Sequence, residues 1–312
     1  MDSKFVCFMK GLAANLLKGR QIHLCLGAAE KDIVLNKDKT GPLRSVPKKV
    51  WIYWDSQKIP YTVQTIIDIN RDSSPDYEFV VLTPGNVFDF IPEVDFPKDL
   101  LRAHKADYIR LQLLALYGGV WVDATTILIE GLGWIEKVNN DRQFDLLGYY
   151  RDKSTLDYSF PIVETWFLAA PPENRFILLW LELFSPILDY GSTDFFQQLK
   201  SRKDYALLSQ RMSDPSYLLL NLCEQQASRE LGDVNMFLKR CEDSAFYIQE
   251  QCEWDFNRIN FVLCRQQMPL ERYRIIKLTS RDREFTDYYR KWGLIDKGSI
   301  IGQLLQKQIS NV

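Results

Sequence analysis

Apolar and polar positions follow two different periods in the first third of the chain. The run Lys49-Val-Trp-Ile-Tyr-Trp54 is β-branched and aromatic, which is typical of a buried strand. Residues 59–70 then place apolar side chains at helical spacing, and Tyr77-Glu-Phe-Val-Val-Leu82 is a second strand-like run. A strand, a helix and a strand at this spacing predict a βαβ unit and therefore a parallel sheet.

The pattern beyond residue 90 continues this alternation and then becomes mostly helical. A helix is predicted over residues 98–117, ended by Gly118-Gly119. Further strands are predicted at 120–123, 144–149, 162–169 and 273–278; residues 125–129 either continue the first of these or form a hairpin with it. From residue 173 to about 267 the spacing is mostly helical. The pattern thus predicts one α/β domain with its sheet in the first 170 residues and a helical C-terminal part.

Composition and charge exclude several classes of function. Hydrophobic residues make up 46% of the chain and charged residues 26%, which is typical of a globular protein. A formal net charge of −2 offers no basic field, so we expect no nucleic-acid partner. The chain has only two histidines, His23 and His104, which excludes His-rich metal sites and most catalytic triads. No secretory signal and no apolar run of membrane-spanning length is evident, so we expect a cytoplasmic protein.

Candidate chemistry is concentrated between residues 103 and 126. Asp107 and Arg110 lie three positions apart on the predicted helix, so both project from one face. The Gly118-Gly119 turn leads into a strand whose only charged residue, Asp123, stands at its C-terminal end, where open α/β sheets bind ligands. An arginine fork binds phosphate oxygens, and carboxylates accept from sugar hydroxyls or hold a cation. Singly, these residues also fit a surface ion pair and a turn cap; together they favour a site for a polar diphosphate ligand.

The same segment resembles a known family. Its pattern, Ala-Asp-x-x-Arg at 106–110 followed by Tyr-Gly-Gly-Val-Trp-Val-Asp-Ala-Thr at 117–125, is similar to the capsular polysaccharide synthesis proteins. These are relatives of the DXD-sugar-binding glycosyltransferases, which include yeast initiating mannosyltransferases and clostridial glucosylating toxins. The resemblance extends to 46–54, 74–78 and 164–174, and so covers roughly residues 45–190.

The resemblance implies an α/β fold of the GT-A (Rossmann-like) glycosyltransferase type with a helical C-terminal part. On this basis we expect an N-terminal extension over residues 1–45, predicted to be helical, and a nucleotide-sugar-binding GT-A core over 46–190. Residues 191–312 are expected to form a mostly helical part that completes the acceptor side.

The resemblance also implies roles for individual residues. Asp107 and Arg110 match the pair that holds the donor sugar and its phosphates, and Asp123 matches the first Asp of the DXD motif, so these three form the expected catalytic set. The expected substrate-binding set is Tyr53, Trp54, His104, Gly118, Gly119, Glu164 and Trp166. For several of these a structural role stays open: Trp54 either stacks on the nucleobase or fills the core, Glu164 and Trp166 border the acceptor or serve packing, and His104 reaches the pocket or lies on the helix surface.

The chain departs from the DXD motif at its third position. It has Asp123-Ala124-Thr125, and a threonine hydroxyl is a much weaker ligand for a hard divalent cation than a carboxylate. We therefore expect Mn²⁺ or Mg²⁺ to bind weakly, through Asp123, Thr125 and the donor's own phosphates. Arg110, and a Lys or Arg from the helical half, are expected to help neutralise the departing diphosphate.

The expected reaction is retaining transfer of a hexose from a UDP- or GDP-linked donor to a hydroxyl of a surface or capsular glycan. An acceptor on a lipid carrier would place the protein at the inner face of the plasma membrane, as a peripheral membrane protein. Two alternatives stay open: a non-catalytic nucleotide-sugar or glycan binding module, and a glycoside hydrolase. The second is disfavoured because Asp107, Arg110 and Asp123 together suit a phosphate and a sugar.

Overall fold

The computed structural model describes residues 3–18, 30–36 and 45–310, and two β-sheets lie within them. The larger sheet contains β1 (Asp32–Leu35), β2 (Lys49–Tyr53), β3 (Glu78–Leu82), β4 (Gly119–Val122), β6 (Leu146–Tyr150), β7 (Val163–Ala170) and β8 (Met236–Arg240). The smaller sheet pairs β5 (Thr126–Leu128) with β9 (Ile275–Lys277).

The helices make up most of the remaining chain. They are α1 (Ser3–Lys18), α2 (Tyr61–Ser73), α3 (Arg102–Tyr117), α4 (Gly133–Asp141), α5 (Arg175–Phe184), α6 (Ile187–Lys200), α7 (Tyr205–Ser209), α8 (Leu219–Leu231), α9 (Tyr247–Gln251), α10 (Phe256–Arg265), α11 (Thr286–Lys291) and α12 (Ile300–Ser310). Short 3-10 helices lie at Val87–Asp89, Asp152–Ser154, Cys241–Asp243 and Leu270–Arg272. No helix in these described ranges is long and apolar enough to cross a membrane.

The larger sheet is mixed, with strand order β1-β8-β6-β7-β4-β2-β3. Strands β4, β2 and β3 are parallel, β7 runs antiparallel to both β4 and β6, β8 is parallel to β6, and β1 is antiparallel to β8. The predicted βαβ unit is therefore confirmed as β2–α2–β3. The antiparallel strand β7 brings its N-terminal end beside the C-terminal end of β4, because Asp123 N donates to Trp166 O at 2.9 Å.

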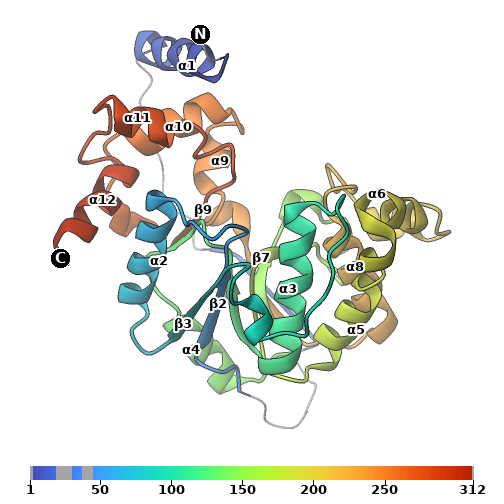
Figure 1. Ribbon diagram of the computed structural model, residues 1–312. Coiled ribbons are helices and arrows are strands. Elements are labelled where there is room, and N and C mark those ends of the chain that lie inside the picture. Colours follow the sequence, from blue (N-terminus) through green and yellow to red (C-terminus); the bar gives the residue numbers. More distant parts are fainter. Residues whose placement is uncertain (1–2, 19–29, 37–44, 311–312) are drawn as a thin grey trace.

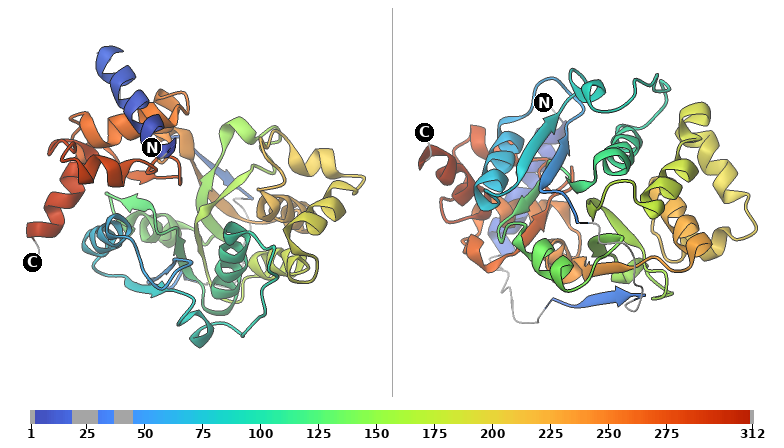
Figure 2. Two further views of the ribbon diagram at one scale, coloured as in Figure 1. Left: turned by 45° about the horizontal axis from the view of Figure 1, so that its top comes forward. Right: turned by 90° about the horizontal axis from the view of Figure 1, so that it is seen from below.

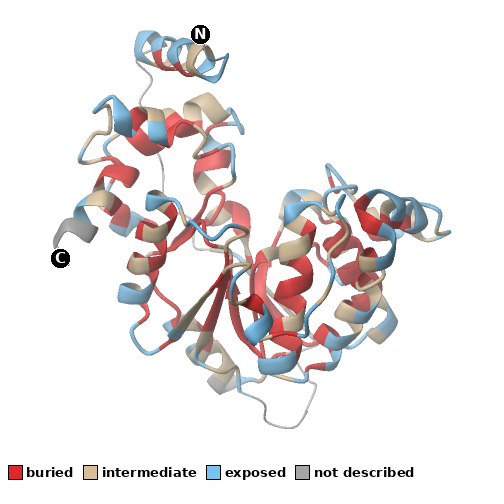
Figure 3. Ribbon diagram, viewed as in Figure 1, coloured by how far each residue is buried: buried red, intermediate tan, exposed pale blue. Residues whose placement is uncertain are grey.

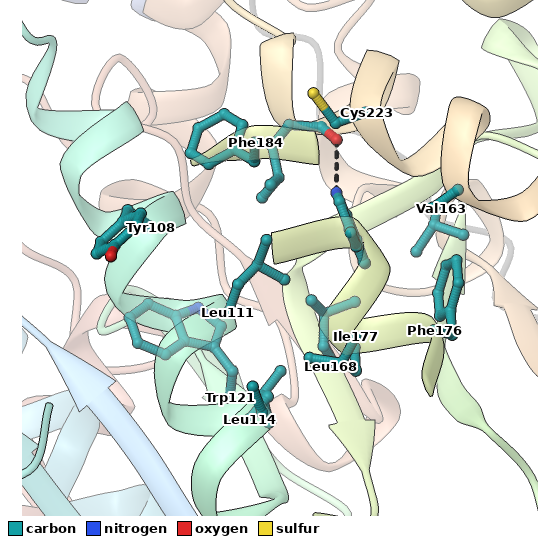
Figure 4. Packing of buried hydrophobic residues seen from close by; sticks show 14 of the residues in the cluster. Tyr108, Leu111, Leu114, Trp121, Val163, Leu168, Phe176, Ile177, Phe184 and Cys223 are labelled. Carbon is teal, nitrogen blue, oxygen red and sulfur yellow. Dashed lines mark hydrogen bonds between the residues drawn. The ribbon is translucent and has the colours of Figure 1, made fainter. Parts of the chain in front are cut away.

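Each face of the sheet is covered by its own layer of helices (Figures 1 and 2). On one face α3, α5 and α8 pack together over Trp51 and Trp121, which are register partners on β2 and β4. Leu111 of α3 and Ile177 of α5 belong to the same buried layer (Figure 4). The opposite face presents aliphatic partners of the same strands, such as Val50 and Val120, to α2 and α4. The alternation of side chains along a strand thus supplies both faces with apolar groups.

The C-terminal elements form a third apolar cluster beside α2 (Figure 1). Helix α12 contacts α2, and α10 contacts both α12 and α1, so α10 connects the first and last helices of the described chain. Phe8 of α1 packs edge-on against Tyr289 of α11, with 5.0 Å between ring centroids. Burial follows these layers, with the central strands and inner helix faces buried and the outer helix faces exposed (Figure 3).

The predicted α/β class with a helical C-terminal part is confirmed, and three elements differ from the prediction. Residues 236–240 form strand β8 inside the segment expected to be helical, so the sheet is not confined to the first 170 residues. Residues 126–128 neither extend β4 nor form a hairpin with it, because they pair with β9. The N-terminal extension contains the predicted helix, α1, but also the edge strand β1; residues 19–29 and 37–44 of that extension lie outside the described residues.

Glu224 on α8 is a buried carboxyl group that makes the stability of this fold depend on pH. It accepts hydrogen bonds from Ser228 Oγ at 2.6 Å and Gln225 Nε2 at 2.9 Å, and burial raises its pKa to about 7 from 4.5. Between these pH values the folded protein holds a proton that the unfolded chain releases. The resulting stabilisation is complete below the unfolded pKa and is lost as the pH rises through the folded one.

We therefore expect the free energy of unfolding to fall by roughly 3 kcal/mol, from this group alone, between about pH 4.5 and about pH 7.5. Urea unfolding at a series of pH values measures this change. Glu224→Gln should make that part of the curve shallower, with the contribution of Glu164 remaining, whereas Glu271→Gln, at an exposed position, should leave it as in the wild type. Equal slopes for the wild type and Glu224→Gln would contradict the prediction.

Candidate functional site

Asp107, Arg110 and Asp123 come together at the C-terminal end of β4. Arg110 and Asp107 lie one turn apart on α3, and Arg110 Nη1 donates to Asp107 Oδ1 at 2.5 Å. The other arm of the guanidinium, Nη2, donates to Asp123 Oδ1 at 2.9 Å. Arg110 is 4% exposed, and its Nε is buried without a hydrogen-bond partner. One arginine therefore joins the helix pair to the residue at the strand end.

Asp123 receives bonds from three donors. Besides Arg110, Trp121 Nε1 donates to Oδ1 at 2.9 Å and Lys277 Nζ donates to Oδ2 at 2.7 Å. Burial alone would raise the pKa of Asp123, but the charges of Lys277 and Arg110 outweigh it and lower the pKa below its usual value. Asp123 is therefore ionised at neutral pH, although 27% of its side chain remains exposed to solvent. An accessible carboxylate held by two cations can meet a polar ligand without first changing its own charge.

Asp107 lies in a drier environment than Asp123. Its side chain is only 11% exposed, and burial raises its pKa, opposed mainly by the charge of Arg110 and then by that of His104. The two carboxylates on either side of Arg110 thus have pKa values shifted in opposite directions.

Lys277 is a member of this cluster that no motif in the sequence singles out. It lies on β9, whose register places Lys277 opposite Thr126, three residues after Asp123. The sequence predicts a Lys or Arg from the helical half near the diphosphate, and a strand at 273–278. A lysine within a predicted buried strand indicates a charged partner nearby, because charged groups are rarely buried without one. This was the feature of the sequence that could have identified Lys277.

Thr125 is oriented by the same pairing of strands. Its Oγ1 donates to Leu278 O at 2.7 Å and accepts from Lys277 Nζ at 3.3 Å. The ammonium of Lys277 therefore contacts both side-chain oxygens that Asp123 and Thr125 present on this side. In the described part of the chain, no three His, Cys, Asp or Glu side chains gather to hold a metal ion. As arranged, these residues suit an ammonium better than a divalent ion.

Gly118 and Gly119 have packing reasons for being glycine. Their φ angles are +61° and +96°, in the region that residues with a Cβ rarely adopt. A Cβ would lie 2.5 Å from Pro172 N at Gly118, and 2.5 Å from Lys49 O at Gly119. The glycines thus let α3 turn directly into β4, which places Arg110 beside Asp123.

Tyr53 is the last residue of β2 and Trp54 follows it, and their side chains pack on opposite faces of the sheet. Tyr53 is buried, and its hydroxyl donates to Asp55 Oδ1 at 2.7 Å. Trp54 is half-buried at the edge of the core, with the guanidinium carbon of Arg283 5.3 Å from its ring centroid. Part of the Trp54 ring thus packs against the core, and the rest is accessible to a ligand beside the Arg283 guanidinium.

His104 faces the protein interior rather than the helix surface. It is fully buried, with Nδ1 2.8 Å from Ser192 Oγ and Nε2 3.0 Å from Tyr217 O. Both ring nitrogens are thus bonded within the protein, and they tie α3 to α6 and to the segment before α8.

Glu164 and Trp166 form a second polar group next to the first. Both lie on β7, and burial raises the pKa of Glu164 to about 7, against the opposing charge of Arg151. Trp166 is buried and packs on Tyr149 at a centroid distance of 4.8 Å. Since Asp123 N bonds Trp166 O, this group adjoins the cluster around Arg110.

The sequence of this chain matches the capsular polysaccharide synthesis protein family over residues 25–270, well over half its length, and the match includes Asp107, Arg110 and Asp123. The chain belongs to this family. The resemblance seen in the segment 103–126 is thereby confirmed. The family match ends before β9, so Lys277 lies outside it.

Curated relatives of this family member are fungal proteins named as glycosyltransferases. The O-glycosyltransferase braB of Annulohypoxylon truncatum is 27% identical over 167 residues, which cover 47% of this chain and 39% of that protein. Glycosyltransferase afumC of Aspergillus fumigatus is 27% identical over 47% of this chain and 41% of its own length. The matches thus span only about two fifths of these relatives. Among solved structures, the PaToxG glycosyltransferase aligns with a TM-score of 0.36 and 15% identity, over 84% of this chain and 89% of that one.

Proposed function

We propose that this protein is a glycosyltransferase that moves a hexose from a nucleotide-sugar donor to a hydroxyl of a glycan. The observation that supports it most is the bridge formed by Arg110 and Lys277 on Asp123, at the C-terminal end of a sheet strand. A sugar nucleotide combines a diphosphate with sugar hydroxyls, and this cluster combines two cations with two carboxylates. Family membership and the names of the fungal relatives agree with the proposal.

Glycosyl transfer requires a group that stabilises the negative charge developing on the diphosphate as it leaves the sugar. The bond between the anomeric carbon and the diphosphate oxygen breaks with its electron pair on that oxygen, while the acceptor oxygen bonds to the anomeric carbon and passes its proton to the departing diphosphate. Arg110 offers a buried, always charged guanidinium for the developing charge on the diphosphate. Asp107 and Asp123 accept from sugar hydroxyls and position the ring. We propose that transfer retains the anomeric configuration.

The acceptor side is proposed to lie at Glu164 and Trp166. Arg151 extends this region, because its guanidinium carbon lies 5.0 Å from the ring of Trp254, which is 41% exposed. An exposed indole backed by charged groups suits a sugar ring, whose apolar face stacks while its hydroxyls bond to the charges. A lipid-linked or surface glycan at the inner face of the membrane is the proposed acceptor.

Donor hydrolysis tests this function. The purified chain is incubated with a panel of UDP- and GDP-sugars, and release of the nucleoside diphosphate is measured. We expect release from at least one donor, and NMR of the sugar product should show the donor's anomeric configuration when an acceptor alcohol is supplied. Binding of a nucleotide sugar without any turnover would instead favour a non-catalytic binding module.

A further inference from the structure

The ammonium group of Lys277 contacts the two side-chain oxygens of the DXD-like segment that a metal ion would need as ligands. Lys277 Nζ lies 2.7 Å from Asp123 Oδ2 and 3.3 Å from Thr125 Oγ1. These atoms belong to the first and third residues of Asp-Ala-Thr, the two positions whose side chains could hold a metal. A divalent ion that used both oxygens would have to displace the lysine.

The backbone around Lys277 leaves little freedom for that displacement. On one side Leu278 N donates to Thr125 O at 3.0 Å and Thr125 Oγ1 donates to Leu278 O at 2.7 Å. On the other side Lys277 N donates to Ala245 O at 2.9 Å. Lys277 itself is 8% exposed, so its stem is packed as well as its backbone. Moving the ammonium away from Asp123 would require the lysine to find another partner from a largely buried position.

The charges of the cluster also oppose a divalent ion. Two cations, Arg110 and Lys277, already share the single negative charge of Asp123, and Asp107 balances Arg110 from the other side. A further double positive charge would meet two like charges at close range, whereas a diphosphate would bring negative charge to both of them.

We propose that the Lys277 ammonium takes the place of the divalent ion in this chain, so that donor cleavage proceeds without a bound metal. The inference rests on the proposed glycosyl transfer and replaces the expectation of a weakly bound Mn²⁺ or Mg²⁺. The lysine holds Asp123 in position and, together with Arg110, faces the leaving diphosphate with positive charge. Thr125 then serves to orient the lysine rather than to bind metal.

Mn²⁺ binding tests this proposal independently of activity. Electron paramagnetic resonance counts free Mn²⁺ while MnCl₂ is titrated into the full chain, with and without UDP or GDP. We expect no protein-dependent binding by the wild type beyond that of the nucleotide alone. Lys277→Met combined with Thr125→Asp frees one carboxylate and adds another, and should bind Mn²⁺ measurably, at least ~10-fold more tightly than the detection limit set by the wild type. Lys297→Met, at an exposed lysine of the same C-terminal part, is the matched control and should behave as the wild type.

Activity in chelator provides the second measurement. The rate of donor hydrolysis by the wild type should change less than about twofold on addition of EDTA or of Mn²⁺. The Lys277→Met variant should hydrolyse the donor at least ~10-fold more slowly than the wild type. Circular dichroism and melting temperature establish that the variant is folded, and added Mn²⁺ should restore part of the activity in the double variant. Metal-dependent wild-type activity, or tight Mn²⁺ binding by the wild type, would overturn the proposal. If the wild type turns over no donor at all, the proposed function fails, and the Mn²⁺ titration still decides what Lys277 does.

Discussion

Replacement of Asp123 by asparagine is expected to lower glycosyl transfer by ~10²–10³-fold, the loss typical when a positioned charged group is removed from an active site. The substitution keeps the shape of the side chain but removes the charge that Arg110 and Lys277 share. Without that common counter-ion the two cations would repel each other, and the donor sugar would lose a charged acceptor for its hydroxyl hydrogens. The effect should appear in kcat as well as in KM, because the carboxylate positions the reacting ring.

Initial rates at varied donor concentration measure this effect, and thermal unfolding measures its structural cost. Asp123→Asn should also lower the melting temperature, since removal of one partner from a largely buried ion pair leaves the other unpaired. Asp76→Asn, at an exposed position before β3, is the matched control and should keep both rate and melting temperature. A folded Asp123→Asn variant with ordinary activity would rule out the site assignment.

Replacement of Trp54 by alanine is expected to raise the donor KM by about 10- to 100-fold, which corresponds to the ~1–3 kcal/mol of a base stacked on an aromatic side chain. Trp54 follows β2 directly, and its N–H donates to Leu82 O at 2.9 Å, so the backbone holds the indole at the end of two parallel strands. Its ring is only partly covered by the core, and the nearby Arg283 supplies a cation on the same side of the molecule. The loss should fall on donor binding rather than on the chemical step.

Two other tryptophans separate stacking from packing. Trp292→Ala removes an indole that is 56% exposed and should leave the donor KM unchanged. Trp51→Ala removes a fully buried indole of β2 and should mainly lower the free energy of unfolding, by the ~3–5 kcal/mol typical of a large core truncation, which appears as a lower melting temperature. If Trp54→Ala resembles Trp51→Ala, with lost stability and unchanged donor affinity, then Trp54 is a core residue.

The parts of the site that could be predicted depend on short stretches of sequence. Helical spacing places Asp107 and Arg110 on one face of α3, and the glycine turn delivers Asp123 to the end of the next strand, so three residues within 17 positions could be assigned together. Lys277 could not be located in this way. Its position depends on the pairing of β5 with β9. The periodicity of the local sequence does not determine which distant strand a three-residue strand pairs with.

The fold shows the same limit at β8. Its sequence, Met-Phe-Leu-Lys-Arg at 236–240, is a short apolar run between helices, and five residues do not distinguish a strand from part of a buried helix. The structure assigns it to the sheet because β6 and β1 offer partners on both of its edges. Tertiary pairing, rather than intrinsic preference, decides such segments.

The pairing of β5 with β9 also sets when the site can form during synthesis. Asp123 and Lys277 are separated by 154 positions, so a nascent chain exposes the strand end with its aspartate long before the lysine emerges. During that interval the sheet around β4 can assemble from nearer partners, but Asp123 has only Arg110 as a cationic neighbour among the residues that hold it. Closing so long a loop is slow compared with local folding, and the site is therefore expected to mature last, as the C-terminal elements dock on α2.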